Sequence, residues 1–180
     1  MSAARNKIQQ LLANNEKFAS SFPGAPQMTQ IQATRGAPGA EILVILTCFD
    51  PRCVPEAFFG PDLQAAVFRN AGGRVTEDVI RSLNILRAVV SLELVAIVHH
   101  TDCGMSHATD EEVRAFAKSK NPAAAAVVDK IDFGMWKEEH LEETVREDVR
   151  KLRDETSLDG LDLLGFVLDT QTGAVKDVEI

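Results

Sequence analysis

Two unbroken apolar runs constrain this chain more than any other feature. Residues 42–46 and 94–98 contain no polar side chain that would face solvent. A continuous run of this kind is typical of a strand covered on both faces, as in a parallel sheet between helices. Between them lie a short apolar segment at 65–68 and an amphipathic helical pattern at 77–90, for which Thr76 is the expected N-cap. The order of strand, helix and strand predicts a right-handed parallel crossover.

The later part of the chain completes an α/β pattern. Residues 163–168 predict another strand, and the Thr172-Gly173 turn leads into 174–178 as an antiparallel C-terminal edge strand. Short helices are expected within 105–133, and a surface helix over 138–153. We therefore predict an α/β fold with a mainly parallel central sheet of about four strands, this antiparallel edge strand, flanking helices and an N-terminal helical arm.

The first forty residues have the pattern of an arm. A helix with a thin apolar stripe is expected over 3–19, and prolines and glycines then interrupt regular structure over 21–40. The pattern alone fits two arrangements equally well, packing on another subunit or lying on the chain's own core. We predict a single domain over 1–180, with 1–40 as the N-terminal arm and 41–180 as the catalytic core.

Both main apolar runs end in side chains that a core does not need. Cys48, Asp50 and Arg52 follow the first run, and His100 and Cys103 follow the second. Ligands of an open parallel α/β sheet bind beyond the carboxyl ends of its strands, so we expect these two ends to meet. Two thiolates and one imidazole suit Zn²⁺, and three protein ligands leave a fourth position open, as in catalytic zinc sites. Cys48, His100 and Cys103 are therefore predicted metal ligands.

Asp50 and Arg52 are the predicted catalytic residues beside that fourth position. Arg52 lies two residues from Asp50 and can bind its carboxylate through paired hydrogen bonds. While Arg52 holds Asp50, the fourth position is free for water. When Asp50 is released, its carboxylate can bind the metal and close the site, which makes Asp50 a conditional metal ligand as well.

The sequence gives less reason to assign the remaining cysteine and histidines to the site. Cys53 is expected to be a structural thiol, and His99 should point to the opposite side of its strand from the ligand that follows it. His107 is a candidate proton relay, although a solvated or structural histidine is the commoner case. His140 lies in an acidic surface helix and is expected to be solvated.

The composition excludes several classes of function. The formal net charge is −8, which argues against nucleic acid or an anionic membrane as a partner. No apolar stretch reaches the roughly 18 residues of a membrane span, and the N-terminus lacks the apolar centre of a secretion signal. Three cysteines are too few for a disulfide framework, so a reducing, cytoplasmic location is expected.

At its two motifs the sequence resembles the β-class carbonic anhydrases. The matching positions are Cys48, Asp50 and Arg52 in one signature motif, His100, Cys103 and Gly104 in the other, and Arg69–Gly73 in a third loop. The chain is most similar to the short forms that carry His-His-Thr-Asp-Cys-Gly-Met, some of which are fungal. The likeness extends from about residue 41 to residue 107 and, more loosely, to the C-terminus.

The resemblance implies a lyase, a carbonate dehydratase, that reversibly hydrates carbon dioxide to bicarbonate and a proton. Cys48, His100 and Cys103 would bind Zn²⁺, zinc-bound hydroxide would attack carbon dioxide, and Asp50 and Arg52 would form the catalytic dyad. Members of the family are dimers or larger oligomers, in which the N-terminal helix wraps a neighbouring subunit. The resemblance therefore favours a homodimer or a dimer-based oligomer, which is the first of the two arrangements open to the arm.

The chain departs from the family pattern in a few places. Phe49 and Pro51 stand where smaller or more polar residues are usual. Trp136 is the only tryptophan and there is no tyrosine, so the family's inhibitory bicarbonate pocket is not expected here. A substrate-pocket glutamine of the family could correspond to Gln27 or Gln30.

Two other functions remain open at this stage. Hydrolysis of carbonyl sulfide or carbon disulfide would use the same zinc site. A non-catalytic zinc-binding assembly protein would keep the fold without the reaction, although loss of Asp50 or Arg52 would be its usual sign and both are present.

Overall fold

The computed structural model of the chain describes residues 3–180, which fall into two compact units divided after Thr34. The first unit contains α1 (Ala3–Ser21) and α2 (Met28–Ala33). No residue of α1 is buried by the described chain. Its apolar stripe consists of four exposed side chains, Ile8, Leu11, Leu12 and Phe18. The helix predicted over 3–19 is thus present, and it extends two residues further.

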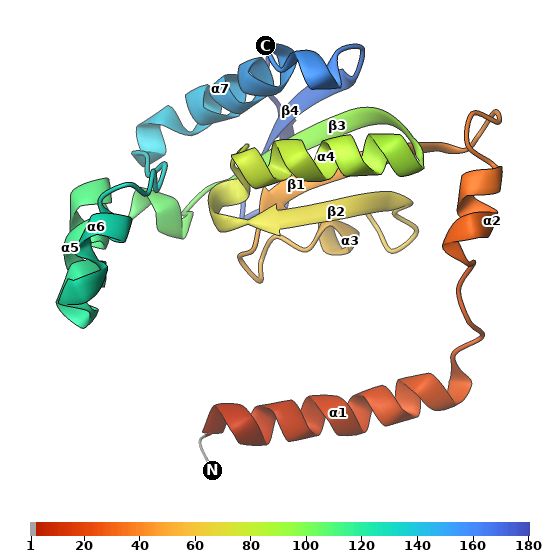
Figure 1. The fold of residues 1–180 in the computed structure, drawn as a ribbon, viewed down its shortest axis with the longest axis horizontal. Coiled ribbons are helices and arrows are strands. Elements are labelled where there is room, and N and C mark those ends of the chain that lie inside the picture. The colour runs from red at the N-terminus through yellow and green to blue at the C-terminus, as the bar shows by residue number, and fades with distance from the viewer. Residues whose placement is uncertain (1–2) are drawn as a thin grey trace. The chain divides into compact units, whose positions relative to one another are not determined.

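The second unit, Arg35–Ile180, is built on a five-stranded sheet in the order β2-β1-β3-β4-β5 (Figure 1). The strands are β1 (Glu41–Cys48), β2 (Ala65–Asn70), β3 (Ser91–His100), β4 (Asp162–Leu168) and β5 (Val175–Asp177). The first four are parallel to their neighbours, and β5 pairs antiparallel to β4. The predicted fold class is therefore confirmed, with β1 and β3 lying side by side at the centre.

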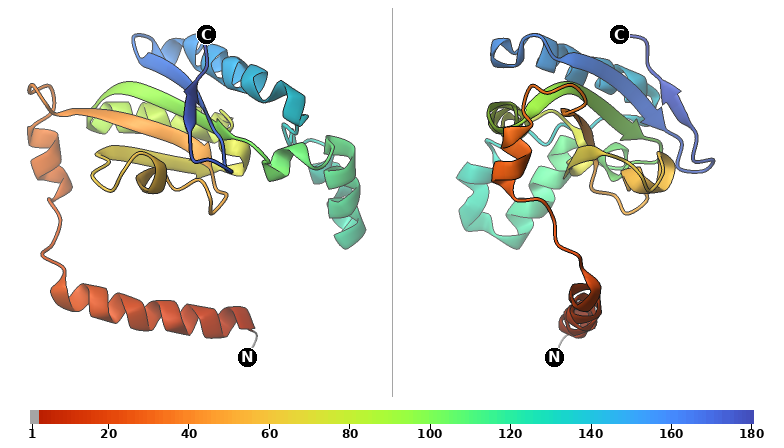
Figure 2. Two further views of the ribbon diagram at one scale, coloured as in Figure 1. Left: turned by 180° about the vertical axis from the view of Figure 1, so that it is seen from behind. Right: turned by 90° about the vertical axis from the view of Figure 1, so that its right-hand side faces the viewer.

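Helices cover both faces of this sheet. α4 (Glu77–Val89) and α7 (Leu141–Arg153) lie on one face, and the short α3 (Pro55–Phe58) lies on the other (Figure 2). α5 (Asp110–Lys120) and α6 (Ala125–Val128) come between β3 and α7 in the chain. Over residues 3–180, no helix combines the length and the apolar character that a bilayer crossing requires.

The start of α4 differs in one detail from the sequence prediction. Thr76 was expected to cap this helix, but its hydroxyl makes no capping hydrogen bond. The main-chain oxygen of Thr76 accepts the first helical bond from Ile80 (3.1 Å), and Glu77 and Asp78 supply the negative charge that favours this end of a helix. Capping by a side chain occurs instead at α5, where Thr109 Oγ1 accepts from the Glu112 N–H (3.2 Å).

The core lies on both faces of the central strands, because the fully buried neighbours Ile45 and Leu46 point to opposite sides of β1. Its fully buried side chains come from the two central strands and from α4 and α7: Ile45, Leu46, Val79, Leu83, Val95, Ile97, Val145 and Val149. α7 buries its apolar face together with Thr144 and Asp148, and its other charged residues are partly or fully exposed. At Gly165 the helix comes so close to β4 that a Cβ would lie 2.6 Å from Val145 Cγ1.

Candidate metal centre

Three metal-ligating side chains meet at the carboxyl edge of the sheet. Cys48 is the last residue of β1, His100 is the last residue of β3, and Cys103 lies three residues further along the loop. All three are buried, and one donor atom from each lies within 4.8 Å of the others. Among residues 3–180 this is the one group of three or more His, Cys, Asp or Glu side chains with such spacing. The two predicted strand ends therefore do meet.

The geometry of the donors fits Zn²⁺. At a zinc–sulfur distance of about 2.3 Å, two sulfurs at a tetrahedral angle lie about 3.8 Å apart, and here Cys48 Sγ and Cys103 Sγ are 4.0 Å apart. His100 Nδ1 lies 2.9 Å from the main-chain oxygen of Thr101, which places a proton on Nδ1 and makes Nε2 the nitrogen that could bind a metal. That Nε2 atom is buried and has no hydrogen-bond partner, a costly state that a metal ion would relieve.

The charges of the three donors are coupled. The hydrogen bond between the two thiols lowers the pKa of Cys48 and raises that of Cys103, so one thiolate is shared between two sulfurs. Burial lowers the pKa of His100, but Cys48 and Cys53 beside its ring outweigh this effect and raise the pKa to about 10. Metal binding would therefore displace protons from this group.

Cys53 lies close to this centre without joining it. It is fully buried and is a free thiol beside the His100 ring, but its sulfur is not in the group of converging donors. This placement agrees with the structural role predicted for it.

Arg52 holds Asp50 beside the donors. Its Nε donates to Asp50 Oδ1 (3.0 Å) and its Nη2 to Asp50 Oδ2 (2.8 Å), and its main-chain N–H also donates to Oδ1 (2.8 Å). The hydrogen bonds from Arg52 lower the pKa of Asp50 to about 2. The carboxylate is not in the group of converging donors, so this arrangement is the one in which the fourth position was expected to be free. Coordination of a metal by Asp50 remains a prediction.

The Arg69–Gly73 loop is hydrogen-bonded to the loop that carries Asp50. Arg69, near the end of β2, donates from Nε to the main-chain oxygen of Cys48 (3.0 Å) and from Nη2 to that of Asp50 (2.7 Å). Gly73 has φ of +71°, and a Cβ there would lie 2.9 Å from the main-chain carbon of Thr47. The backbone of this loop thus approaches β1 so closely at Gly73 that a side chain would not fit there.

Behind the centre lies a buried polar network that the sequence did not reveal. His99 is fully buried and points to the face opposite His100, where its Nδ1 lies 2.8 Å from Thr144 Oγ1 on α7. Its Nε2 is 3.2 Å from Asp148 Oδ2, and its ring stacks on Trp136 with centroids 5.6 Å apart. His99 thus points away from His100, as predicted, and its ring is hydrogen-bonded to α7.

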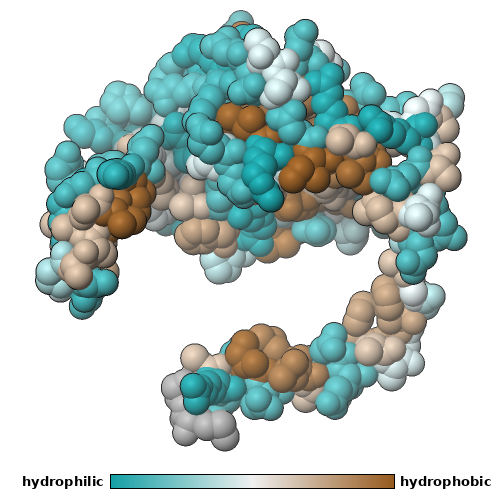
Figure 3. Space-filling model, viewed as in Figure 1, coloured by the Kyte–Doolittle hydropathy of each residue, from teal (hydrophilic) through white to brown (hydrophobic). Residues whose placement is uncertain are grey.

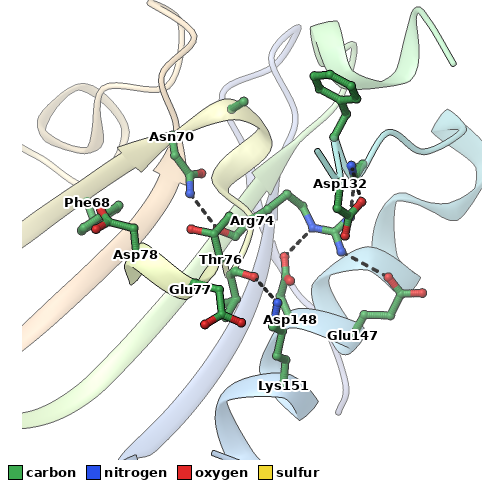
Figure 4. Close-up of a pocket in the computed structure, with 14 residues that line it drawn as sticks. Phe68, Asn70, Arg74, Thr76, Glu77, Asp78, Asp132, Glu147, Asp148 and Lys151 are labelled. Atoms are coloured by element: carbon green, nitrogen blue, oxygen red, sulfur yellow. Dashed lines mark hydrogen bonds and ion pairs between the residues drawn. The ribbon is translucent and has the colours of Figure 1, made fainter. Parts of the chain in front are cut away.

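Arg74 completes this network (Figure 4). Its Nε lies 2.8 Å from Asp148 Oδ2, its Nη2 lies 3.3 Å from Glu147 Oε2, and its guanidinium is 5.5 Å from the centroid of the Trp136 ring. Arg74, Glu147 and Asp148 border a cavity of about 850 Å³, which residues of β2 and α4 also line. Lys151, the other cation of this cavity, donates to the main-chain oxygen of Val75 (2.8 Å). Both cations are therefore already engaged.

The remaining histidines lie at the surface. The side chains of His107 and His140 are each 64% exposed. His140 is solvated, as predicted. His107 Nε2 lies 2.8 Å from Asp102 Oδ1, and no contact places it against the three donors. The relay role of His107 remains a prediction, and its partner Asp102 was not among the predicted site residues.

Three comparisons with known proteins bear on this site. A family model described as carbonic anhydrase matches residues 43–175, which include every residue of the centre. Beta-carbonic anhydrase 1 of Mycobacterium tuberculosis is 31% identical over 173 residues, covering 93% of this chain and 94% of that protein. The crystal structure of carbonic anhydrase from Streptococcus mutans superposes with a TM-score of 0.77 at 29% identity, over 99% of each chain.

A relative with a different named activity matches a smaller part. The carbon disulfide hydrolase of an Acidianus species is 40% identical over 92 residues, which cover 50% of this chain and 45% of that protein.

Proposed function

The chain belongs to the β-class carbonic anhydrases, enzymes that interconvert carbon dioxide and bicarbonate, and we propose that Cys48, His100 and Cys103 hold its zinc ion. The observation that carries this assignment is the convergence of three buried donors at the ends of two neighbouring strands, with the buried His100 Nε2 left without any other partner. The reaction is the reversible hydration of carbon dioxide to bicarbonate and a proton.

A zinc ion in such a site supplies a Lewis acid that brings the pKa of water down to about 7. The chain's own residues do the rest. Arg52 keeps Asp50 ionised and holds its carboxylate outside the group of converging donors, so that water would take the fourth position. The carboxylate of Asp50 accepts a hydrogen bond from the reacting water and orients its lone pair toward carbon dioxide.

The test combines metal content with rapid-mixing hydration kinetics. We expect stoichiometric zinc in the wild-type protein, loss of both zinc and activity in Cys48→Ala, and retained zinc with much reduced activity in Asp50→Asn. A zinc-loaded wild type without hydration activity would exclude the reaction, and an active wild type no faster than Asp50→Asn would exclude the assignment of Asp50.

Carbon disulfide or carbonyl sulfide hydrolysis is the second candidate. It is supported by the Acidianus relative, whose printed name is carbon disulfide hydrolase and which matches half of this chain. The same donors and the same reacting water would serve a sulfur-containing triatomic substrate. Hydrogen sulfide release from either substrate, measured beside carbon dioxide hydration on one preparation, decides between them.

We further propose that the enzyme is a homodimer or a dimer-based oligomer. α1 has no buried residue and leaves its apolar stripe unpartnered within the described chain. The helix carries three basic side chains, Arg5, Lys7 and Lys17, against the single acidic Glu16, whereas the whole chain has a net charge of −8. Apolar area and opposite charge both favour docking of α1 on the core of a second copy.

We also propose the cytoplasm as its compartment. All three cysteines are free thiols, and two of them are the proposed zinc ligands, which must stay reduced to bind metal.

A further inference from the structure

Arg52 has a second carboxylate partner besides Asp50. Its Nη1 donates to Asp102 Oδ2 (2.8 Å), and its Nη2 donates to the main-chain oxygen of Asp102 (2.9 Å). The guanidinium therefore lies between two loops, bound on one edge to Asp50 after β1 and on the other to Asp102 after β3. Four of its five N–H groups take part in these bonds.

Asp102 is itself held from several sides. It is the one residue other than glycine with a positive φ (53°) in the described part of the chain, which is an uncommon conformation for an aspartate. Its main-chain N–H donates to Glu138 Oε1 (3.0 Å), and its Oδ1 lies 2.8 Å from His107 Nε2. Ser106 Oγ donates to the other oxygen of Glu138 (2.8 Å), so the acceptor is fixed as well. The position of Asp102 is thus determined by contacts that do not involve Arg52.

We propose that Asp102 is a positioning residue that holds Arg52 in the orientation that captures Asp50. A planar guanidinium that is hydrogen-bonded on two edges is held in one orientation. The same long side chain bound on one edge only can adopt many orientations. Without Asp102, Arg52 would release Asp50 more often, and the carboxylate would be free to turn to the metal. The inference rests on the proposed function, because it assumes a metal ion at Cys48, His100 and Cys103.

The exposure of the two side chains limits how strongly Asp102 can hold Arg52. Arg52 and Asp102 have side chains 43% and 53% exposed, and an isolated surface ion pair contributes little. Two bonds to a rigid partner contribute more than such a pair, and we expect the free Asp50 population to rise by about fivefold when Asp102 loses its charge.

The test uses the full-length protein loaded with Co²⁺ in place of zinc, at one fixed pH. Asp102→Asn keeps the size of the side chain and tolerates the positive φ, while it removes the charge that Arg52 binds. Glu139→Gln is the matched control, because it removes one exposed carboxylate near Glu138 without touching Arg52. The cobalt absorption spectrum reports the fourth ligand, and kcat/KM of the zinc enzyme is measured in parallel.

We expect Asp102→Asn to shift the cobalt spectrum toward carboxylate coordination and to lower kcat/KM by about fivefold, with Glu139→Gln behaving as wild type. In an Asp50→Ala background, Asp102→Asn should leave the spectrum unchanged, because no carboxylate remains to turn. A wild-type spectrum and kcat/KM in Asp102→Asn would overturn the proposal, and so would a spectral change that persists without Asp50.

These outcomes are separable from failure of the proposed function. A wild-type protein that binds Co²⁺ but does not hydrate carbon dioxide contradicts the proposed reaction, and the spectra still decide the role of Asp102. A wild-type protein that binds no Co²⁺ overturns both.

Discussion

Two properties of the metal centre are set by residues close in the chain. The main-chain oxygen of Thr101 sets the His100 tautomer, and Arg52 sets the charge of Asp50. Neither neighbour is more than two residues away along the chain. Short-range contacts of this kind follow from the strand ends themselves, and substitutions of single residues should therefore act on one property at a time.

Replacing Arg52 by Gln should raise the pKa of Asp50 from about 2 toward the ordinary value of about 3.9. A carboxyl whose pKa is depressed by folding stabilises the fold above its unfolded-state pKa, and this contribution is lost as the pH falls through the folded-state pKa. The ion pair should therefore stabilise wild type above about pH 4 and contribute progressively less between about pH 4 and pH 2. Carbon-13 carboxyl titration by NMR measures the first effect, and urea unfolding of both proteins across this pH range measures the second.

Replacing Cys53 by Ala should leave zinc content unchanged, because its sulfur is outside the group of converging donors. The same change at Cys103 should abolish stoichiometric zinc binding. Metal analysis after dialysis distinguishes the two variants, and a zinc-free Cys53→Ala protein that remains folded would show that Cys53 belongs to the ligand set.

At the scale of elements, α7 ties the back of the centre together. Thr144 and Asp148 on this helix contact His99 of β3, and Asp148 also binds Arg74 after β2. The helix thus joins two strand ends whose loops supply the site, and it does so through a carboxylate that is almost completely buried.

Asp148→Ala should lower the free energy of unfolding by about 3–5 kcal/mol, because it leaves the largely buried Arg74 guanidinium without its closest carboxylate. Glu147→Ala is the control on the same helix, since Glu147 is largely exposed and its bond to Arg74 is longer, and it should cost at most about 1 kcal/mol. Urea unfolding at neutral pH measures both. Equal losses in the two variants would show that the buried pair contributes no more than a surface pair.

Gly165→Ala should cost about 1–3 kcal/mol, because the new Cβ would lie 2.6 Å from Val145 Cγ1 and would push α7 away from β4. Shortening Val145 to Ala removes the clash, so the double variant should lose less stability than the sum of the single variants. Thermal or urea unfolding of all four proteins gives this coupling, and strict additivity would argue against direct contact.

At the scale of the whole molecule, the exposed apolar stripe of α1 is a feature that packing within the described chain does not explain. The space-filling view shows apolar side chains gathered along this helix, and the same view shows others over α5 and α6 (Figure 3). About half of each apolar side chain in this stripe is exposed, so burial of apolar surface contributes little to the stability of the helix by itself.

Replacing Leu11 and Leu12 by Glu should dissociate the proposed dimer, because two charges would replace the centre of the stripe. Gln9→Glu with Gln10→Glu adds the same charge next to the stripe and is the matched control. Sedimentation velocity over a concentration series reports the oligomeric state. Association unchanged in the first variant would show that α1 does not form the interface.

Much of the fold could be predicted from the sequence because its helices and strands are determined by neighbouring residues. The apolar runs at β1 and β3, the stripe of α7 and the turn before β5 each follow from neighbouring residues, and each predicted element is present within a few residues. The Thr76 cap was the exception, because rotation of one hydroxyl decides it.

The sequence by itself determined which side chains stand at the ends of β1 and β3, since a parallel sheet brings the carboxyl ends of neighbouring strands to one edge. Only the tertiary structure decided what surrounds them. His99 and Thr144 are 45 residues apart in the chain, and Arg52 and Asp102 are 50 apart, so no local pattern connects them. Packing of α7 on the sheet and of one loop on another creates those contacts. These contacts hold the centre in place because a buried charge needs a partner, and that partner can come from a distant part of the chain.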